Sequence, residues 1–234
     1  MTKPVIQLSN IRFRYSEQDQ DVLDIADLQV YQGEHLFIQG ASGRGKTTLL
    51  NIITGINPPY TGQVQVLDTP LQTLSSIQSD QFRVDHLGII FQQFNLLPYL
   101  SLLENVQLPC WFSSKRRTQA VDVEQSSTDL LTQLRIPERL FNKPASALSV
   151  GQQQRVAVAR ALIGKPAIII ADEPTSALDT DNRKRFLDLL FSQADKQNST
   201  VVFVSHDQYI AQHFSRVIDI SDINQAINHT ATVS

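Results

Sequence analysis

An apolar run at residues 35–39 leads directly into the segment Gly-Ala-Ser-Gly-Arg-Gly-Lys-Thr at residues 40–47, and a helix-like run continues to residue 53. The segment matches the pattern GxxxxGK[ST] completely and lies between a strand and a helix, where this pattern binds phosphate. Its glycines let successive backbone N–H groups point at phosphate oxygens, and the helix N-terminus adds partial positive charge. Lys46 is expected to bridge the β- and γ-phosphates of a nucleotide, and the Thr47 hydroxyl to bind Mg²⁺.

Short β-rich runs alternate with helix-like runs along most of the chain. Strands are expected at residues 5–8, 35–39, 88–91, 167–171 and 201–205, and helices at residues 46–53, 152–163 and 182–193. Three of the strand runs are almost continuously apolar, which is typical of a parallel sheet buried on both faces. The alternation predicts an α/β fold with a mostly parallel core sheet.

The strand signal disappears between about residues 95 and 165, where residues 101–106 and 125–134 are helix-like. We interpret this span as a helical lobe inserted into the α/β core. Within it, residues 113–117 contain the basic run Lys-Arg-Arg and are expected to form a solvated turn, because short basic runs usually lie on the surface. The chain looks loose from about residue 222 onward.

The composition limits the classes of protein. The chain has 234 residues, is 41% hydrophobic and 18% charged, and carries a net charge of −3, so nucleic acid is not expected as a main partner. Its single cysteine, Cys110, lies in an apolar stretch and is expected to be a buried small hydrophobe. No apolar run approaches the roughly 20 residues needed to cross a bilayer, and the N-terminus lacks a basic-then-apolar leader. We therefore expect a soluble, cytoplasmic protein without direct membrane insertion.

A second motif lies at residues 168–173, an apolar run that ends in Asp172 and Glu173. In phosphoryl-transfer sites such a strand delivers an aspartate to the Mg²⁺ shell. Glu173 would then orient or deprotonate an attacking water. The alternative, a strand that ends in a solvated acidic turn, is disfavoured by the phosphate loop in the same chain.

A third motif, Leu-Ser-Val-Gly-Gln at residues 148–152, precedes a helix-like run. Ser149 and Gln152 have the spacing of a capping box, so a well-capped helix is one interpretation. The other is a second anion site, with the Ser149 hydroxyl and the Gly151 amide directed at a phosphate.

In chain order, these motifs resemble those of nucleotide-binding subunits of ABC transporters, over nearly the whole chain. Residues 40–47 match the Walker A loop, 168–173 the Walker B strand and 176–179 the D-loop, and residues 148–152 resemble the LSGGQ signature. The resemblance extends to three single residues: Gln92 at the Q-loop glutamine, His206 at the switch histidine and Tyr15 at the aromatic that stacks on adenine. Val150 departs from the pattern, because the family has glycine there; a Cβ could restrict φ or crowd the γ-phosphate.

The resemblance implies a set of site residues for ATP and Mg²⁺. It implies catalytic roles for Glu173, His206 and Gln92, and Mg²⁺ ligation by Thr47, Gln92 and Asp172. It implies that ATP is bound by Tyr15, Gly40, Ala41, Ser42, Gly43, Arg44, Gly45, Lys46, Thr47, Thr48, Ser149, Gly151, Gln152 and Asp179.

The resemblance also implies an architecture: a single ABC ATPase domain over residues 1–234. Residues 1–94 and 166–222 would form a P-loop NTPase core with a mostly parallel sheet and an N-terminal antiparallel β region. Residues 95–165, approximately, would form the inserted helical subdomain, and residues 223–234 a C-terminal tail.

In this family two subunits close head to tail, so that ATP held by one P-loop is capped by the signature helix of the other. The resemblance implies a homodimer that hydrolyses ATP on the cytoplasmic face of the inner membrane and drives integral membrane permease subunits. Residues 88–98 and 103–106 are similar to the lipoprotein-release, macrolide-export and cell-division group. In that group residues 92–106 would face a cytoplasmic helix of the membrane partner.

Three alternatives remain at this point. A soluble ABC ATPase acting on ribosomes or DNA usually has two cassettes or a long coiled-coil insertion, and this chain has neither. A P-loop kinase or GTPase lacks the signature helix and the switch histidine. A degenerate cassette that binds ATP without cleaving it is opposed by Lys46, Glu173 and His206.

Overall fold

The computed structural model describes residues 3–176, 178 and 180–227, without the side chains of residues 180–182. The chain divides into two compact units: unit 1 comprises Met1–Asp80 with Val202–Ser234, and unit 2 comprises Gln81–Val201. Each unit is described by itself below.

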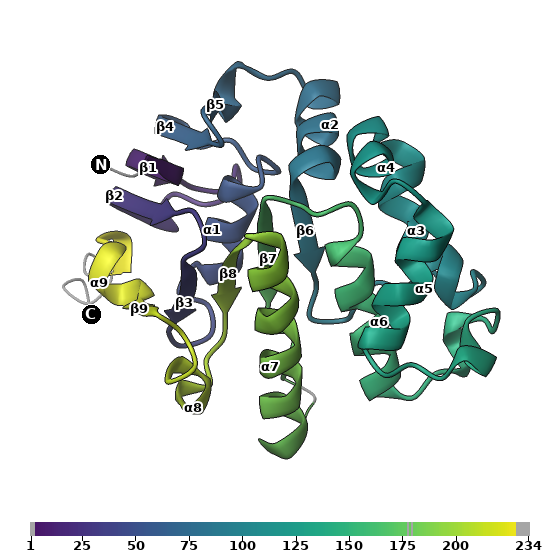
Figure 1. Cartoon of the computed structure of the whole chain (residues 1–234). Helices are drawn as coiled ribbons and strands as arrows, with labels where there is room; N and C mark the ends of the chain where they lie inside the picture. Colours follow the sequence, from purple (N-terminus) through teal and green to yellow (C-terminus); the bar gives the residue numbers. More distant parts are fainter. Residues whose placement is uncertain (1–2, 177, 179, 228–234) are drawn as a thin grey trace. The chain divides into compact units, whose positions relative to one another are not determined.

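Unit 1 begins with an antiparallel sheet (Figure 1). Its strands are β1 (Pro4–Phe13), β2 (Leu23–Tyr31), β4 (Thr61–Val66) and β5 (Thr69–Pro70), in the order β2-β1-β4-β5. Ile6 pairs with Val30 on one side and with Val66 on the other, and all three side chains are buried. The predicted N-terminal antiparallel β region is therefore confirmed.

The second sheet of unit 1 is parallel and carries the phosphate loop. β3 (His35–Gln39) pairs with β9 (Arg216–Asp219), and the order is β8-β3-β9, where β8 is Thr200–Val204. The middle of β3 is fully buried, as its continuous apolar run predicts. The helical elements of unit 1 are α1 (Lys46–Ile53), η1 (Leu71–Thr73), α8 (Gln208–Ala211) and α9 (Ile220–Ile223).

Unit 2 contains two parallel strands that lead to predicted site residues. β6 (Leu87–Ile90) pairs with β7 (Ile168–Asp172), and Ile90 lies opposite Ala171. The strand order is β6-β7-β8. Strand β8 belongs to both units, because the boundary between them falls within it. Helix α2 (Ser76–His86) directly precedes β6 in the chain, and α7 (Thr180–Gln197) connects β7 to β8. The predicted parallel α/β core is thus confirmed.

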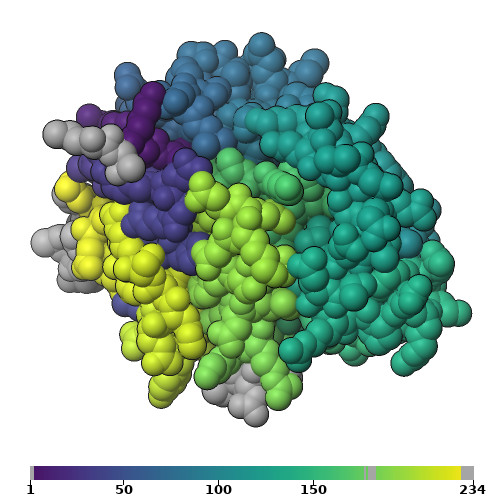
Figure 2. Space-filling view, in the orientation of Figure 1, coloured from purple at the N-terminus to yellow at the C-terminus, as the bar shows by residue number. Residues whose placement is uncertain are grey.

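Between β6 and β7 the chain forms the predicted helical lobe, visible as teal and green helices in Figure 1 and as a continuous teal surface in Figure 2. Its elements are α3 (Leu102–Phe112), α4 (Ser114–Ala120), α5 (Val123–Gln133), η2 (Glu138–Leu140), η3 (Ala145–Ala147) and α6 (Val150–Leu162). Helix α6 packs against both α3 and α5. Cys110 is buried in this lobe, as expected.

The expectation of a solvated turn at residues 113–117 is wrong. These residues lead into helix α4, and Arg116 is only 1% exposed. Its guanidinium donates hydrogen bonds to the carbonyl oxygens of Val84, Leu87, Ala161 and Ile163. Burial lowers the pKa of Arg116 to about 10, and the four carbonyl partners make its burial tolerable.

The expectation of a loose end from residue 222 is wrong for residues 222–227. Asn224 is buried, and its side chain accepts a hydrogen bond from the Asp24 amide and donates to the carbonyl oxygens of Val22 and Arg44. The C-terminal segment is therefore bonded to the start of β2 and to the phosphate loop. Among the described residues, no helix has the length and hydrophobicity of a membrane span.

Candidate nucleotide-binding site

The phosphate loop connects β3 to α1 through three glycines in backbone conformations that L side chains rarely adopt. Gly40, Gly43 and Gly45 have φ of 149°, 78° and 91°. A Cβ at Gly40 would lie 2.4 Å from Ile220 Cγ2, and one at Gly45 would lie 2.8 Å from Leu23 Cδ2. A Cβ at Gly43 would meet no atom within 4 Å. The loop therefore needs glycine for backbone shape at all three positions and for packing at two.

Lys46 is the cation of this loop, and its side chain is folded back into it. The residue is only 5% exposed, and Nζ donates to the carbonyl oxygens of Gly40 at 2.7 Å and Ala41 at 3.0 Å. Gly45 begins α1 without a side-chain cap, so no side chain of the N-cap occupies the N–H groups of the first turn. A buried ammonium at the N-terminus of a helix is a donor set that suits phosphate.

Asp219, at the end of β9, is a carboxylate of the site that the motifs do not reveal. Its pKa is lowered by hydrogen bonds from the Ser221 side chain and backbone, by a bond from Gln39 and by the charge of Lys46. An acidic residue after a short strand carries no distinctive sequence signal, so pattern analysis missed it.

Tyr15 lies at the edge of α1. Its hydroxyl is 3.1 Å from Thr48 Oγ1, and its ring packs edge-on against Phe13 with centroids 5.0 Å apart. Thr48 lies in the first turn of α1, so the contact connects the Tyr15 side chain to the helix that follows the phosphate loop.

His206 lies at the same sheet edge as the start of the phosphate loop. The Ser205 amide donates to the Ile38 carbonyl, so β8 ends level with the end of β3. Asp207 then caps α8 by accepting a hydrogen bond from the Tyr209 amide. Unit 1 thus brings together Tyr15, residues 40–48 and His206.

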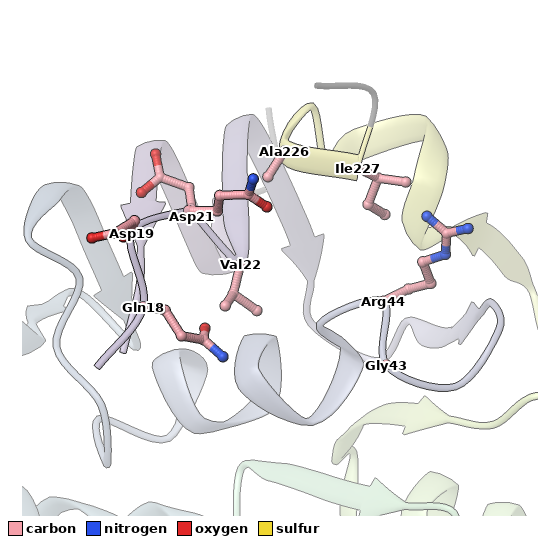
Figure 3. Close-up of a pocket in the computed structure, with 9 residues that line it drawn as sticks. Gln18, Asp19, Asp21, Val22, Gly43, Arg44, Ala226 and Ile227 are labelled. Atoms are coloured by element: carbon pink, nitrogen blue, oxygen red, sulfur yellow. The ribbon is translucent and has the colours of Figure 1, made fainter. Parts of the chain in front are cut away.

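A cavity of about 490 Å³ lies beside the loop (Figure 3). Asp19 and Asp21 stand on one side and the Arg44 guanidinium on the other. Tyr15 is not among the residues that line it, which are Gln18, Asp19, Gln20, Asp21, Val22, Gly43, Arg44, Ala226 and Ile227.

Unit 2 supplies the two strand ends that the motifs predicted. Gln92 follows β6 and Asp172 ends β7, and because the strands are parallel neighbours, both residues lie at the carboxyl edge of the sheet. Glu173 follows in a left-handed conformation with φ of 44°. Such a conformation in a residue other than glycine is typical of functional sites.

Gln154 of α6 fixes the chain just after Glu173. Its amide donates to the Pro174 carbonyl at 3.0 Å, and the Gln154 side chain is buried. Residues 152–154 are three consecutive glutamines, and the sequence does not indicate which of them reaches the Pro174 carbonyl, so this contact could not be predicted from the sequence.

The signature segment forms the predicted capping box. Ser149 Oγ accepts from the Gln152 amide at 3.4 Å, and Gln152 Oε1 accepts from the Ser149 amide at 3.0 Å. Val150 is the first residue of α6 and is 51% exposed. Its Cβ is therefore compatible with the helical backbone, and the expected restriction of φ does not arise. Gly151 has open space around its Cβ position. Asp179 lies outside the described residues.

The three residues predicted to bind Mg²⁺ are Thr47 in unit 1 and Gln92 and Asp172 in unit 2. Each carries a side-chain oxygen, the type of ligand atom that Mg²⁺ prefers. Among the described residues there is no cluster of three or more His, Cys, Asp or Glu side chains that would hold a metal ion by itself. One carboxylate with neutral oxygens matches the usual sharing of Mg²⁺ between protein and phosphate groups.

Comparison with known proteins agrees with this geometry. The family model described as "ABC transporter" matches residues 23–176, which include the phosphate loop, the signature helix and the two acids at the end of β7, Asp172 and Glu173. This chain belongs to the ABC transporter family.

Two relatives illustrate the range of the family. The macrolide export ATP-binding/permease protein MacB of Pectobacterium atrosepticum is 42% identical over 95% of this chain, and the chain spans 34% of that protein's length. The lipoprotein-releasing system ATP-binding protein LolD of Saccharophagus degradans is 38% identical over 93% of this chain and 94% of its own length.

A solved ABC cassette supports the fold. The dimeric post-hydrolysis structure of the ATP-binding cassette MJ0796, bound to ADP and Pi, superposes with a TM-score of 0.82 at 35% identity. The match covers 94% of this chain and 95% of that one. The predicted P-loop α/β fold and the predicted family are confirmed.

Proposed function

We propose that this ABC cassette binds and hydrolyses ATP to power a membrane transporter. The observation that carries the proposal is the phosphate loop of unit 1, with buried Lys46 at the start of α1. Lys46 binds the β- and γ-phosphates, the Thr47 hydroxyl contributes to Mg²⁺ binding, and Tyr15 stacks on the base. We assign the base to Tyr15 rather than to the neighbouring cavity, whose Asp19 and Asp21 add negative charge next to a triphosphate.

The proposed hydrolytic step uses Glu173, His206 and the ligands of Mg²⁺. Thr47, Gln92 and Asp172 would hold the ion, which would neutralise charge on the transferred phosphoryl oxygens. Glu173 orients the attacking water as general base, and His206 donates a hydrogen bond to the γ-phosphate.

The second anion site argues for a dimer of the cassette. Ser149 and Gly151 at the start of α6 cap a nucleotide held by the partner's phosphate loop, with Gln152 fixing the Ser149 conformation. Asp179 couples the two sites. Support comes from the related cassette MJ0796, whose solved structure is dimeric.

The transport partner is an integral membrane permease, and the cassette lies on the cytoplasmic face of the inner membrane. The named relatives serve macrolide export and lipoprotein release, so we assign this cassette to an export or mechanotransmission complex. Tyr99 is exposed within residues 92–106 and Phe91 immediately before them, which suits a surface that receives a cytoplasmic helix of the permease. No ribosome- or DNA-acting protein is among the relatives described above, and that alternative is unsupported.

We further propose that the chain has three functional parts: a core of residues 1–94 and 166–222, a helical subdomain of residues 95–165 and a tail of residues 223–234. The helices α3 to α6 all fall inside the proposed subdomain.

The test is ATP binding and turnover by the purified chain. Lys46→Ala removes the ammonium, and a hydrogen bond to a charged group contributes about 1.5–3 kcal/mol, so ATP affinity should fall about ten- to hundredfold in calorimetry. Lys143→Ala, at an exposed lysine, is the matched control. Unchanged affinity in Lys46→Ala, or wild-type protein without Mg²⁺-dependent turnover, would contradict the proposal.

A further inference from the structure

The segment between β6 and α3, which contains Gln92, is a tight and unusual piece of backbone. The Phe94 amide donates to the Phe91 carbonyl at 3.0 Å and closes a turn whose central residues are Gln92 and Gln93. Phe94 and Asn95 follow with φ of 58° and 48°, so two successive non-glycine residues are left-handed. This conformation is sterically unfavourable for L residues and persists only where other contacts impose it.

One side chain supplies those contacts. Arg160 of α6 donates from Nη1 to the Asn95 carbonyl at 2.6 Å and from Nη2 to the Phe94 carbonyl at 2.5 Å. Successive carbonyls of helical backbone, of either hand, point in similar directions, whereas those of extended backbone alternate. The guanidinium fork can therefore hold both oxygens because both residues are left-handed.

The positive charge of Arg160 also favours these two hydrogen bonds energetically. Burial lowers the pKa of its guanidinium to about 10, so the group is charged at neutral pH and partly removed from water. A desolvated cation is strongly destabilised when its acceptors move away. The two carbonyls and the guanidinium thus stabilise one another.

Helix α6 connects this turn to the two other functional segments of unit 2. Its N-cap is Ser149 of the signature, and Gln154 holds the Pro174 carbonyl next to Glu173. Near Arg160 the helix lies directly on β6, because a Cβ at Gly88 would be 2.3 Å from the Ala161 carbonyl oxygen. The helix is therefore in close contact with the strand that leads to Gln92.

We propose that Arg160 is a positioning residue for Gln92: it holds the Phe94–Asn95 backbone left-handed and so fixes the Gln92 turn relative to the signature helix. This inference rests on the proposed function for the role of Gln92. The proposed role of Arg160 involves no contact with the nucleotide or the metal.

The test compares Arg160→Lys with Arg155→Lys. A lysine keeps the charge but is a point donor that cannot span two carbonyls as a fork. Arg155 is the matched control, because it lies on the same helix and donates to the carbonyls of Gly151, Leu134 and Arg135, away from the Gln92 turn. A second variant, Asn95→Val, acts from the acceptor side, because a β-branched residue disfavours the left-handed conformation at this exposed position.

Two measurements decide the proposal. In nucleotide-free protein, hydrogen exchange of the amides at residues 92–96 should accelerate about tenfold in Arg160→Lys and Asn95→Val. In turnover assays the Mg²⁺ concentration for half-maximal rate should rise about ten- to hundredfold, with KM for ATP changed less than twofold. Arg155→Lys should match wild type in both.

The outcomes separate this inference from the proposed function. If the wild type binds no ATP, the proposed function fails, while the exchange measurement still decides whether Arg160 holds the turn. If Arg160→Lys exchanges like the wild type, or loses only thermal stability with an unchanged Mg²⁺ requirement, Arg160 is merely structural and the inference is overturned. Should Arg160→Lys fail to fold, Asn95→Val gives the same decision.

Discussion

At the scale of single residues, Tyr15, proposed above to stack on the base, is held in place by two contacts within the protein. Its hydroxyl contacts Thr48 Oγ1, and its ring packs edge-on against Phe13. Two contacts in different directions limit rotation of the ring. The side-chain entropy lost on stacking against a base is correspondingly smaller.

This arrangement predicts a clear ranking of two variants. Tyr15→Phe removes only the hydroxyl contact, whose typical contribution of about 0.5–1.5 kcal/mol corresponds to a drop in ATP affinity of at most about tenfold. Tyr15→Ala also removes base stacking, a further contribution of about 1–3 kcal/mol. Calorimetric titration with ATP measures both.

Tyr209, which is 83% exposed on α8, provides the control substitution Tyr209→Ala, expected to bind ATP as the wild type does. If Tyr15→Ala were no weaker than Tyr15→Phe, the base would not stack on Tyr15.

The residues that the sequence predicted share one property: their role depends on near neighbours in the chain. Lys46 is identified by glycines within the same loop, and Ser149 and Gln152 by the spacing of a capping box, which the structure contains. Arg160 could not be identified in this way, because its acceptors lie some 65 residues earlier in the chain. Nothing in the local pattern distinguishes it from Arg155.

At the scale of elements, helix α4 depends on an arginine that is used as a buried crosslink. Arg116 joins the end of α2, the start of β6 and the end of α6 through backbone carbonyls. The close approach requires Gly164, since a Cβ there would lie 2.6 Å from Arg116 Cβ. The prediction of a solvated turn failed because a run of basic residues indicates only that such residues usually lie on the surface. It does not reveal hydrogen-bond acceptors from distant parts of the sequence.

Arg116→Met should therefore destabilise the fold strongly. Several carbonyl oxygens would lose their donor in a buried site, and each buried unsatisfied group costs about 1–3 kcal/mol, so we expect the free energy of unfolding in urea to fall by about 3–5 kcal/mol. Lys115→Met, at the exposed neighbour, should change it by less than about 0.5 kcal/mol. Equal effects of the two substitutions would show that Arg116 is not the crosslink described here.

At the scale of the whole molecule, the chain contains two helix N-termini suited to phosphate, at α1 in unit 1 and at α6 in unit 2. The proposed dimer has one nucleotide bridging the α1 site of one copy and the α6 site of the other. In such a dimer the γ-phosphate is the connection, and its hydrolysis ends the association.

Glu173→Gln should trap this dimer. The amide preserves the size of the side chain but removes the carboxylate that orients water, so ATP should bind without being cleaved. Light scattering with saturating ATP should then give twice the mass of the monomer, and with ADP the monomer alone.

The double variant Lys46→Ala/Glu173→Gln should need about ten- to hundredfold more ATP to dimerise, since it lacks the ammonium that binds ATP. A Glu173→Gln variant that binds ATP as a monomer would contradict the shared site. One that hydrolyses ATP at the wild-type rate would remove Glu173 from its catalytic role.

The bonding of Asn224 has a consequence for how such a cassette is delimited. A fragment that ends after β9 would retain every motif by which the family is identified. It would nevertheless lose the amide that ties Arg44, in the phosphate loop, to Val22 and Asp24 at the start of β2. The stretch that identifies the family is therefore shorter than the stretch that keeps all of these hydrogen bonds. The difference includes Asn224, which belongs to no motif.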